Sequence, residues 1–243
     1  MPTLSVVTSL YRSAPYIEEF CRRIDVQARK LGLSYEIVMI NDASPDNSLS
    51  VARSLIARFP ALRIIDLATN IGQQQAYFTG LSFARGSQIF LLDIDLEDQP
   101  EWLEIFRETM QREGAEIVCG VRKTHEQKQL HRLGSTVYYV VLNLFGPRST
   151  PTYQCMARLI SKKAVSEMLR HAGPTTDISI ACMFTGLSMA TVPVARSYKG
   201  SSSYTLAKRA KLFWNMLDSV LWRTMRQDSR FTVPAIRALY GSQ

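Results

Sequence analysis

The amino-acid sequence predicts an α/β fold in which helices cover both faces of a mostly parallel central sheet. Two observations lead to this prediction. Short apolar runs alternate with amphipathic stretches over roughly the first half of the chain, as expected for consecutive strand and helix units. The 243 residues can also bury one sizeable core, and a content of 46% hydrophobic and 21% charged residues is ordinary for a globular domain.

The first half of the chain is expected to contain strands that are each followed by a helix. Between residues 17 and 31, for example, apolar side chains recur at the spacing of a helix with one buried face. Right-handed connections between such strands produce a parallel, Rossmann-like sheet. The expected strands are 4–10, 35–40, 62–67 and 88–92, and the expected helices are 17–31, 48–59, 73–84 and 100–111.

The second half alternates less regularly. Strands are expected at 117–121, 158–161 and 189–194, and helices at 129–145, 163–171 and 178–187. A last amphipathic helix is expected at 206–225, followed by a short basic tail to residue 243. Its aromatic and basic residues suit a position on an anionic membrane surface, and packing on the core or on a second subunit is the alternative.

The charge of the chain indicates anionic partners. The formal net charge is +8, and no Asp or Glu lies between Asp177 and Asp218. Phosphates of a small substrate, an anionic membrane and nucleic acid would each match this charge. The chain lacks the interleaved basic and aromatic array of a nucleic-acid surface, so we expect no nucleic-acid partner.

The cysteines and the amino terminus point to a reducing, cytoplasmic setting. The four cysteines are far apart and form no CxxC pair, so neither a zinc ribbon nor a disulfide framework is expected. The amino terminus lacks the pattern of a signal peptide. The longest uncharged apolar stretch, 137–145, is shorter than the ~20 residues that a membrane-spanning helix needs.

Carboxylates crowd the segment that follows the fourth expected strand. Asp93 and Asp95 lie two residues apart, so their side chains share one face of an extended segment. Glu97, Asp98 and Glu101 follow closely. Oxygen ligands of this kind suit Mg²⁺ or Mn²⁺, and the alternative is an acidic turn that caps the helix beginning at Pro100. No GxGxxG or Walker loop is present to bind phosphates in another way.

Four segments, taken in order, resemble the motifs of glycosyltransferase family 2, the inverting nucleotide-sugar enzymes of GT-A fold. These segments are N-D-A-S-P-D-N-S at 41–48, N-I-G with Ala76 and Gly80 at 70–80, D-I-D-L-E-D-Q-P-E at 93–101, and the loop 196–204. The resemblance covers roughly residues 4 to 222 and is strongest to the sub-group that makes polyprenyl- or dolichyl-phosphate sugars. Relatives in that sub-group continue into transmembrane helices, which this sequence lacks.

The resemblance implies a domain division and a set of site residues. Residues 1–122 form the nucleotide-sugar-binding half, 123–204 the acceptor half with a lid loop, and 205–243 the carboxyl-terminal helix and tail. Asp93 and Asp95 form the metal-binding DxD motif, and Glu97, where the family commonly has glutamine, is a further metal ligand. The implied nucleotide-binding residues are Thr8, Tyr11, Asp42, Asn70, Gly72, Asp93, Lys199 and Ser202.

The expected chemistry depends on neutralising the leaving diphosphate. A divalent ion at Asp95, together with Arg122 and Arg196, would supply positive charge, although both arginines are also compatible with ordinary surface cations. A phosphate acceptor is already ionised and attacks unaided, whereas a sugar hydroxyl needs a general base. Asp177 is the candidate base, and its alternative role is to cap the helix 178–187.

These inferences combine into one expected function. The chain is expected to be a metal-dependent inverting glycosyltransferase that moves a sugar, from UDP in the first instance, to a polyprenyl phosphate or to a cell-surface glycan. The alternative is a non-catalytic nucleotide-sugar-binding or assembly protein on the same fold. We expect a cytoplasmic protein that meets the inner face of the membrane through residues 205–226, with self-association left open.

Overall fold

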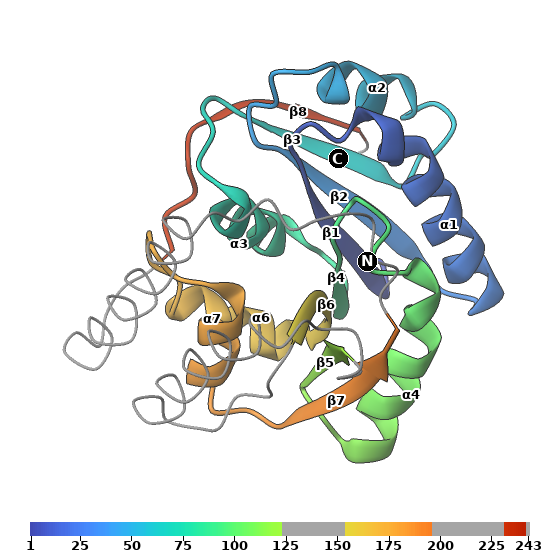
Figure 1. The fold of residues 1–243 in the computed structure, drawn as a ribbon, viewed down its shortest axis with the longest axis vertical. Coiled ribbons are helices and arrows are strands. Elements are labelled where there is room, and N and C mark those ends of the chain that lie inside the picture. Colours follow the sequence, from blue (N-terminus) through green and yellow to red (C-terminus); the bar gives the residue numbers. More distant parts are fainter. Residues whose placement is uncertain (123–153, 196–230, 242–243) are drawn as a thin grey trace, which may run out of the picture.

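The computed structural model describes residues 1–122, 154–195 and 231–241. Its strands form one eight-stranded sheet in the order β7-β5-β6-β4-β1-β2-β3-β8 (Figure 1). Strands β1 to β4 are mutually parallel, as are β5 and β7, which confirms the predicted mostly parallel α/β sheet. Only β6 and β8 run against their neighbours. The strands are β1 Leu4–Leu10, β2 Tyr35–Asn41, β3 Leu62–Leu67, β4 Gln88–Leu91, β5 Ile117–Arg122, β6 Gln154–Ser161, β7 Met189–Val194 and β8 Ile236–Tyr240.

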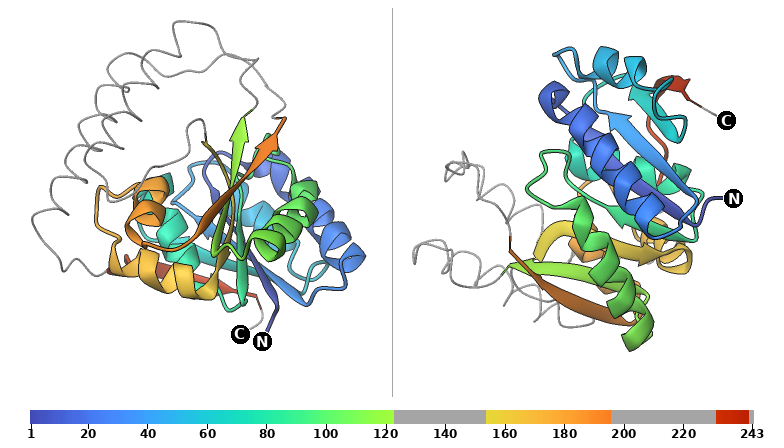
Figure 2. Two further views of the ribbon diagram at one scale, coloured as in Figure 1. Left: turned by 90° about the horizontal axis from the view of Figure 1, so that it is seen from below. Right: turned by 90° about the vertical axis from the view of Figure 1, so that its right-hand side faces the viewer.

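Helices cover both faces of this sheet, as predicted. Helices α1, α2 and α4 lie on one face, and α3, α6 and α7 lie on the other (Figure 2). The helices are α1 Ile17–Lys30, α2 Ser48–Ser54, α3 Gln73–Phe83, α4 Leu103–Glu113, α6 Lys162–Arg170 and α7 Ile178–Phe184, with 3-10 turns η1 Ala14–Tyr16 and η2 Pro100–Trp102.

Each face of the sheet has its own hydrophobic core. All seven residues of β1 are buried, as expected for a central strand that is covered by helices on both sides. On the α1 face, Phe90 of β4 meets Phe106 of α4 edge to face, with ring centroids 5.6 Å apart. On the α3 face, Tyr77 and Phe78 are fully buried against the opposite sides of the same strands. The period-2 strands and period-3.6 helices of the sequence therefore account for both cores.

The carboxyl-terminal residues differ from the sequence-based expectation. Residues 236–240 were expected in a basic tail, but they form β8, which pairs antiparallel with β3 at the sheet edge. Arg237 of β8 lies beside the buried Asp66, with 3.7 Å between Nη1 and Oδ2. A five-residue strand without a neighbouring partner in the sequence carries little periodicity, so this pairing is decided by tertiary contacts.

Two helix boundaries also differ. Helix α2 ends at Ser54 instead of continuing to residue 59, and the helix expected to begin at Pro100 opens with the 3-10 turn η2. The expected helices 129–145 and 206–225 lie outside the described residues. Within the described part of the chain, no helix combines the length and the apolar character that crossing a membrane requires.

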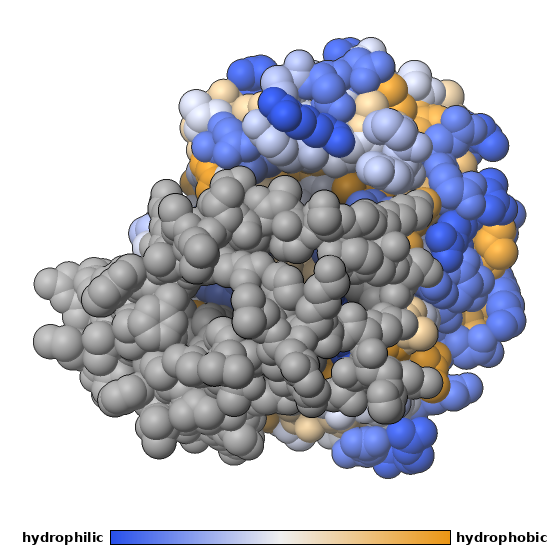
Figure 3. All heavy atoms as spheres, viewed as in Figure 1, coloured by the Kyte–Doolittle hydropathy of each residue, from blue (hydrophilic) through white to orange (hydrophobic). Residues whose placement is uncertain are grey.

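The cysteines and the surface agree with a globular domain in which disulfides play no part. Cys21, Cys119, Cys155 and Cys182 are all buried and free. Where Figure 3 shows described residues around α1 and α4, the surface is mainly hydrophilic. Exposed large apolar side chains, such as Val26 and Ile105, are isolated from one another in the sequence.

Helix α3 approaches the sheet unusually closely at Gly80. A Cβ atom at this position would lie 2.5 Å from Val7 Cγ1 of β1 and still nearer to Ile40 Cδ1 of β2. A side chain here would push the helix away from the strands. The residues at the amino-terminal end of α3 therefore depend on this glycine for their height above the sheet.

We expect Gly80→Ala to lower the free energy of unfolding by about 1–3 kcal/mol, because overpacking outweighs the better helix propensity of alanine. Urea denaturation measures this change. The matched control is Ser82→Ala in the same helix, where the hydroxyl bonds only to the Thr79 carbonyl and a change within about 0.5 kcal/mol is expected. Equal or greater stability of Gly80→Ala would contradict the close packing.

Candidate functional site

The carboxyl ends of six strands meet at one edge of the sheet. Register pairs align Leu10 with Asn41, Asn41 with Asp66, and Arg122 with Val194. Because β4 and β5 both run antiparallel to β6, the ends of β1, β2, β3, β4, β5 and β7 all point the same way (Figure 2). Open α/β sheets bind their ligands at this edge.

The segment after β2 holds the segment after β3 through one carboxylate. Asp42 Oδ1 accepts a hydrogen bond from the Ile71 backbone N–H at 2.7 Å, and Oδ2 accepts one from Gly72 N–H at 3.0 Å. Asn70 Nδ2 donates to the Asp42 carbonyl oxygen at 2.9 Å. Burial raises the pKa of Asp42, and the two backbone N–H groups oppose that rise. We call these contacts the Asp42 clamp.

The clamp determines where α3 begins. Gly72 is the residue before the first helical residue, and its φ of +88° is a conformation that favours glycine. The structure therefore brings Asp42, Asn70 and Gly72 together, as the family motifs imply. It also shows that both oxygens of Asp42 accept bonds from within the protein, which the sequence did not reveal.

Asp93 lies at the same edge, just beyond β4. Its Oδ1 accepts a hydrogen bond from the Tyr77 hydroxyl at 2.6 Å and another from Gln73 Nε2 at 2.9 Å. Burial, followed by the negative charge of Asp93, raises the pKa of Tyr77 well above its usual value. Tyr77 is therefore a neutral donor to this carboxylate at physiological pH.

The rest of the acidic segment divides into two groups. Asp95 Oδ1 accepts a bond from Glu97 N–H at 3.0 Å across a turn in which Leu96 has a φ of +62°, and Asp95 and Glu97 are partly exposed. Asp98 is instead fully buried, and its Oδ2 accepts a bond from Ala157 N–H of β6 at 2.8 Å. Asp98 therefore anchors the segment, which leaves Asp93, Asp95 and Glu97 as the candidates for metal binding.

The donor set at this turn fits a metal ion that is shared with a substrate. Within the described ranges, no group of three or more His, Cys, Asp or Glu side chains converges closely enough to hold an ion alone. Magnesium is generally held by one or two protein carboxylates together with substrate phosphates and water. Asp93 and Asp95 supply oxygen donors of this kind, so they fit an ion completed by a diphosphate.

The candidate base lies close to α3. Asp177 caps α7, because its Oδ1 accepts a bond from Ser179 N–H at 2.7 Å, so the capping alternative describes an observed contact. The Ile178 N–H donates to Gln74 Oε1 of α3 at 3.0 Å. The role of Asp177 as a general base stays a prediction.

One buried arginine supports this region and was not among the predicted site residues. Arg158 of β6 is 2% exposed, and its Nη2 donates to Ser179 Oγ at 2.6 Å and to Gln154 Oε1 at 2.7 Å. It also bonds to the Met156 carbonyl oxygen at 3.0 Å. The signal in the sequence was an arginine inside an otherwise apolar strand, since a buried charge requires several partners.

The remaining predicted residues have different environments. Tyr11 is 48% exposed beside Arg12, just after β1, and Arg122 closes β5 at the same edge. Thr8 is fully buried beneath that edge, and its expected contact with a nucleotide stays a prediction. Arg196, Lys199 and Ser202 lie outside the described residues, so their roles in closing a lid also stay predictions.

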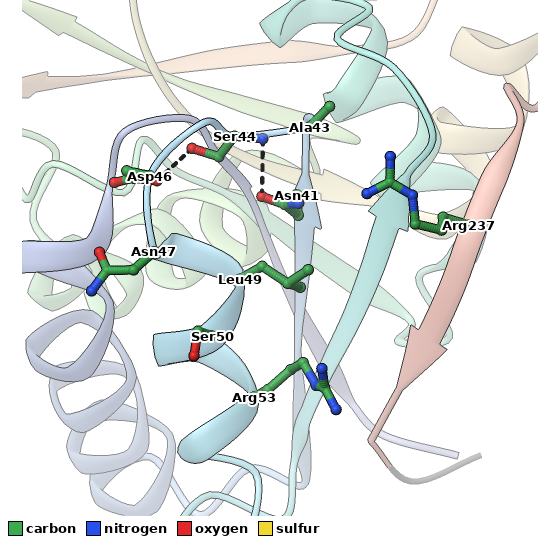
Figure 4. Close-up of a pocket in the computed structure, with 9 residues that line it drawn as sticks. All are labelled: Asn41, Ala43, Ser44, Asp46, Asn47, Leu49, Ser50, Arg53 and Arg237. Carbon is green, nitrogen blue, oxygen red and sulfur yellow. Dashed lines mark hydrogen bonds between the residues drawn. The ribbon is translucent and has the colours of Figure 1, made fainter.

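A pocket of about 340 Å³ lies next to the clamp, between α2 and β8 (Figure 4). Arg53 lies over the Tyr240 ring, 4.4 Å from its centroid, and Arg237 donates to the Ala68 carbonyl oxygen at 3.0 Å. The pocket depends on β8, so sequence reasoning could not have found it. Its lining consists of Asn41, Ala43, Ser44, Asp46, Asn47, Leu49, Ser50, Arg53 and Arg237.

The departure at Asn41 has a structural reason. Asn41 Nδ2 donates to Asp66 Oδ1 at 2.7 Å, and both side chains are buried. The family motif has aspartate at this position, which here would place two carboxylates in contact. Asn41 therefore belongs to the support of β3, and Asp42 is the acid that faces the strand edge.

Comparisons with known proteins agree with this site. A protein of Mycobacterium tuberculosis named among the glycosyltransferases is 32% identical over 206 residues, which are 85% of this chain and 60% of that protein. The chain therefore spans less than two thirds of that relative's length. An undecaprenyl-phosphate 4-deoxy-4-formamido-L-arabinose transferase of Edwardsiella ictaluri is 25% identical over 232 residues, or 94% of this chain and 71% of that protein.

Structural similarity supports the same fold. Glucosyl-3-phosphoglycerate synthase of Mycobacterium tuberculosis, solved with Mn²⁺, UDP and glucosyl-3-phosphoglycerate, superimposes with a TM-score of 0.67 at 15% identity, covering 99% of this chain and 90% of that chain. Such neighbours are GT-A glycosyltransferases, which confirms the predicted GT-A fold. The family model for glycosyl transferase family 2 matches residues 5–169. The chain belongs to glycosyl transferase family 2.

Proposed function

We propose that this chain transfers a sugar, with inversion, from a nucleoside-diphosphate donor to a polyprenyl phosphate, and that the reaction requires a divalent metal ion. The observation that carries the proposal is the position of Asp93 and Asp95 at the sheet edge, beside the Asp42 clamp. Two similar proteins support it: one was solved with Mn²⁺ and UDP, and the other is named as an undecaprenyl-phosphate transferase.

Each group at the edge has a task in this reaction. Asp93 and Asp95 would hold Mg²⁺ or Mn²⁺, which when bound neutralises charge on the leaving diphosphate. Arg122, at the end of β5, would contribute further positive charge. Tyr11, on the exposed side of the edge, would pack against the base, while the clamp keeps the loop at 70–72 in position.

The acceptor determines whether Asp177 takes part in the chemistry. A phosphate is ionised at neutral pH, so a polyprenyl phosphate would attack the anomeric carbon without a base. In that reaction Asp177 would serve through its cap, which holds the first turn of α7 beside α3. We also propose that residues 205–226 bring the site to an anionic membrane, since the acceptor's hydrocarbon chain lies in a bilayer.

We expect Asp95→Asn to reduce sugar transfer by about 100-fold or more, because neutralising one carboxylate weakens the stabilisation of the leaving group. Turnover with radiolabelled donor and undecaprenyl phosphate measures the loss. The matched control is Glu104→Gln, which removes a carboxylate that pairs with Lys30 on the surface of α4. Full turnover by Asp95→Asn would favour a non-catalytic nucleotide-sugar-binding protein.

We expect Asp177→Asn to retain transfer to a polyprenyl phosphate within about threefold, because an ionised acceptor needs no base. Asparagine caps a helix about as well as aspartate, so the melting temperature should also be preserved. A loss of about 100-fold with an unchanged melting temperature would refute the phosphate acceptor and indicate attack by a hydroxyl group.

A thermal-shift panel tests the donor. We expect UDP with Mn²⁺ to raise the melting temperature more than UDP alone, since saturation at 100 times the dissociation constant stabilises the native state by about 2.7 kcal/mol. GDP, CDP and ADP, each with and without Mn²⁺, are the comparison. If none of these nucleotides raises the melting temperature, the proposed donor class is refuted.

A further inference from the structure

We infer that Tyr77 is a positioning residue, which together with Gln73 fixes the carboxylate of Asp93 for metal binding; this inference rests on the function proposed above. Both side chains bond to the same oxygen, Asp93 Oδ1, at 2.6 Å from the tyrosine hydroxyl and 2.9 Å from Gln73 Nε2. They also contact each other, with Gln73 Nε2 donating to the Tyr77 oxygen at 3.2 Å.

The hydroxyl of Tyr77 is not required for packing. Its ring belongs to the core on the α3 face, and the residue is fully buried. A phenylalanine would fill that space equally well. A buried hydroxyl needs a partner, and its shortest contact is the Asp93 carboxylate, with the Leu92 carbonyl oxygen at 3.4 Å. The hydroxyl therefore serves the edge of the sheet instead of the core.

The support for Asp93 is itself held in place. Gln73 is the first residue of α3, and Tyr77 follows one helical turn later, so both side chains lie on one face of the helix. The Asp42 clamp fixes the loop that leads into this turn. Closely packed Gly80 fixes the helix above β1 and β2.

The next two glutamines connect the same turn to the opposite side of the site. Gln74 Oε1 accepts a bond from Ile178 N–H at 3.0 Å, and Gln75 Nε2 donates to the Gly173 carbonyl oxygen at 2.8 Å. Three consecutive glutamines thus reach three different partners. The turn at 73–77 is therefore a rigid base from which Asp93 is held.

Rigid support has a measurable consequence for metal binding. A carboxylate that already has two donors on one oxygen does not need to be ordered when an ion binds. Partners of this kind typically contribute 10- to 100-fold to metal affinity. Loss of the Tyr77 hydroxyl should weaken the affinity for the ion while leaving the fold and the nucleotide contacts in place.

The test is a Mn²⁺ titration of the full chain followed by electron paramagnetic resonance, in the presence of saturating UDP. We expect Tyr77→Phe to bind Mn²⁺ about 10-fold more weakly than the unmodified chain, and its sugar transfer to recover at high Mn²⁺. Gln73→Ala, at an exposed position, should show the same direction of change and remains informative if Tyr77→Phe folds poorly.

A matched control is available in Tyr35→Phe. The Tyr35 hydroxyl also donates to a carboxylate, that of Asp25, but on α1 and away from the acidic segment. Its Mn²⁺ affinity should equal that of the unmodified chain. Wild-type Mn²⁺ affinity in both Tyr77→Phe and Gln73→Ala, with Asp93→Asn impaired, would overturn the positioning role and leave the proposed function intact. If Asp93→Asn also bound Mn²⁺ normally, the proposed metal site would be refuted and the positioning role with it.

Discussion

Two hydrogen bonds from the backbone of residues 71 and 72 to the Asp42 carboxylate determine the geometry of the strand edge. Asp42 follows β2 and the bonded residues follow β3, so the clamp joins the ends of two neighbouring parallel strands. Helix α3 begins directly after this clamp, and its first turn carries the side chains that reach Asp93 and the start of α7. Bonds from backbone N–H groups to a buried carboxylate are strong and directional, which suits a fixed reference point.

The opposite edge of the sheet is held by a second buried carboxylate. Glu36 accepts bonds from Ser5 Oγ and from Arg85 N–H, each at 2.6 Å, and pairs with Arg63 at the same distance. The side chains of Arg63 and Glu36 are only 13% and 7% exposed, so neither charge is well solvated. Such a pair requires that all its partners be present at once, because an unpaired buried charge is costly. The beginnings and the ends of β1 to β4 are thus aligned by separate polar contacts, with apolar packing between them.

The site combines residues that the sequence marks clearly with residues that it does not. The acidic segment and the N-x-G motif are visible as local patterns, and family membership gives them a shared purpose. Tyr77 is different: in the sequence it is an aromatic residue on a buried helix, a pattern typical of core packing. Only its position below Asp93, with 2.6 Å between hydroxyl and carboxylate, shows a polar role. Asp98 shows the reverse, since it looks like a ligand in an acidic run but is buried against β6.

The sequence by itself determined the parallel α/β architecture, most strand and helix positions, the family resemblance and the acidic segment, because periodicity and motif spacing are local properties. Tertiary structure alone decided the pairing of β8 with β3, the division of labour among Asp93, Asp95 and Asp98, and the contacts of Arg158 and Tyr77. These features join residues that are distant in the chain. Their energies depend on burial and on which partners meet, and neither quantity can be read from the order of residues.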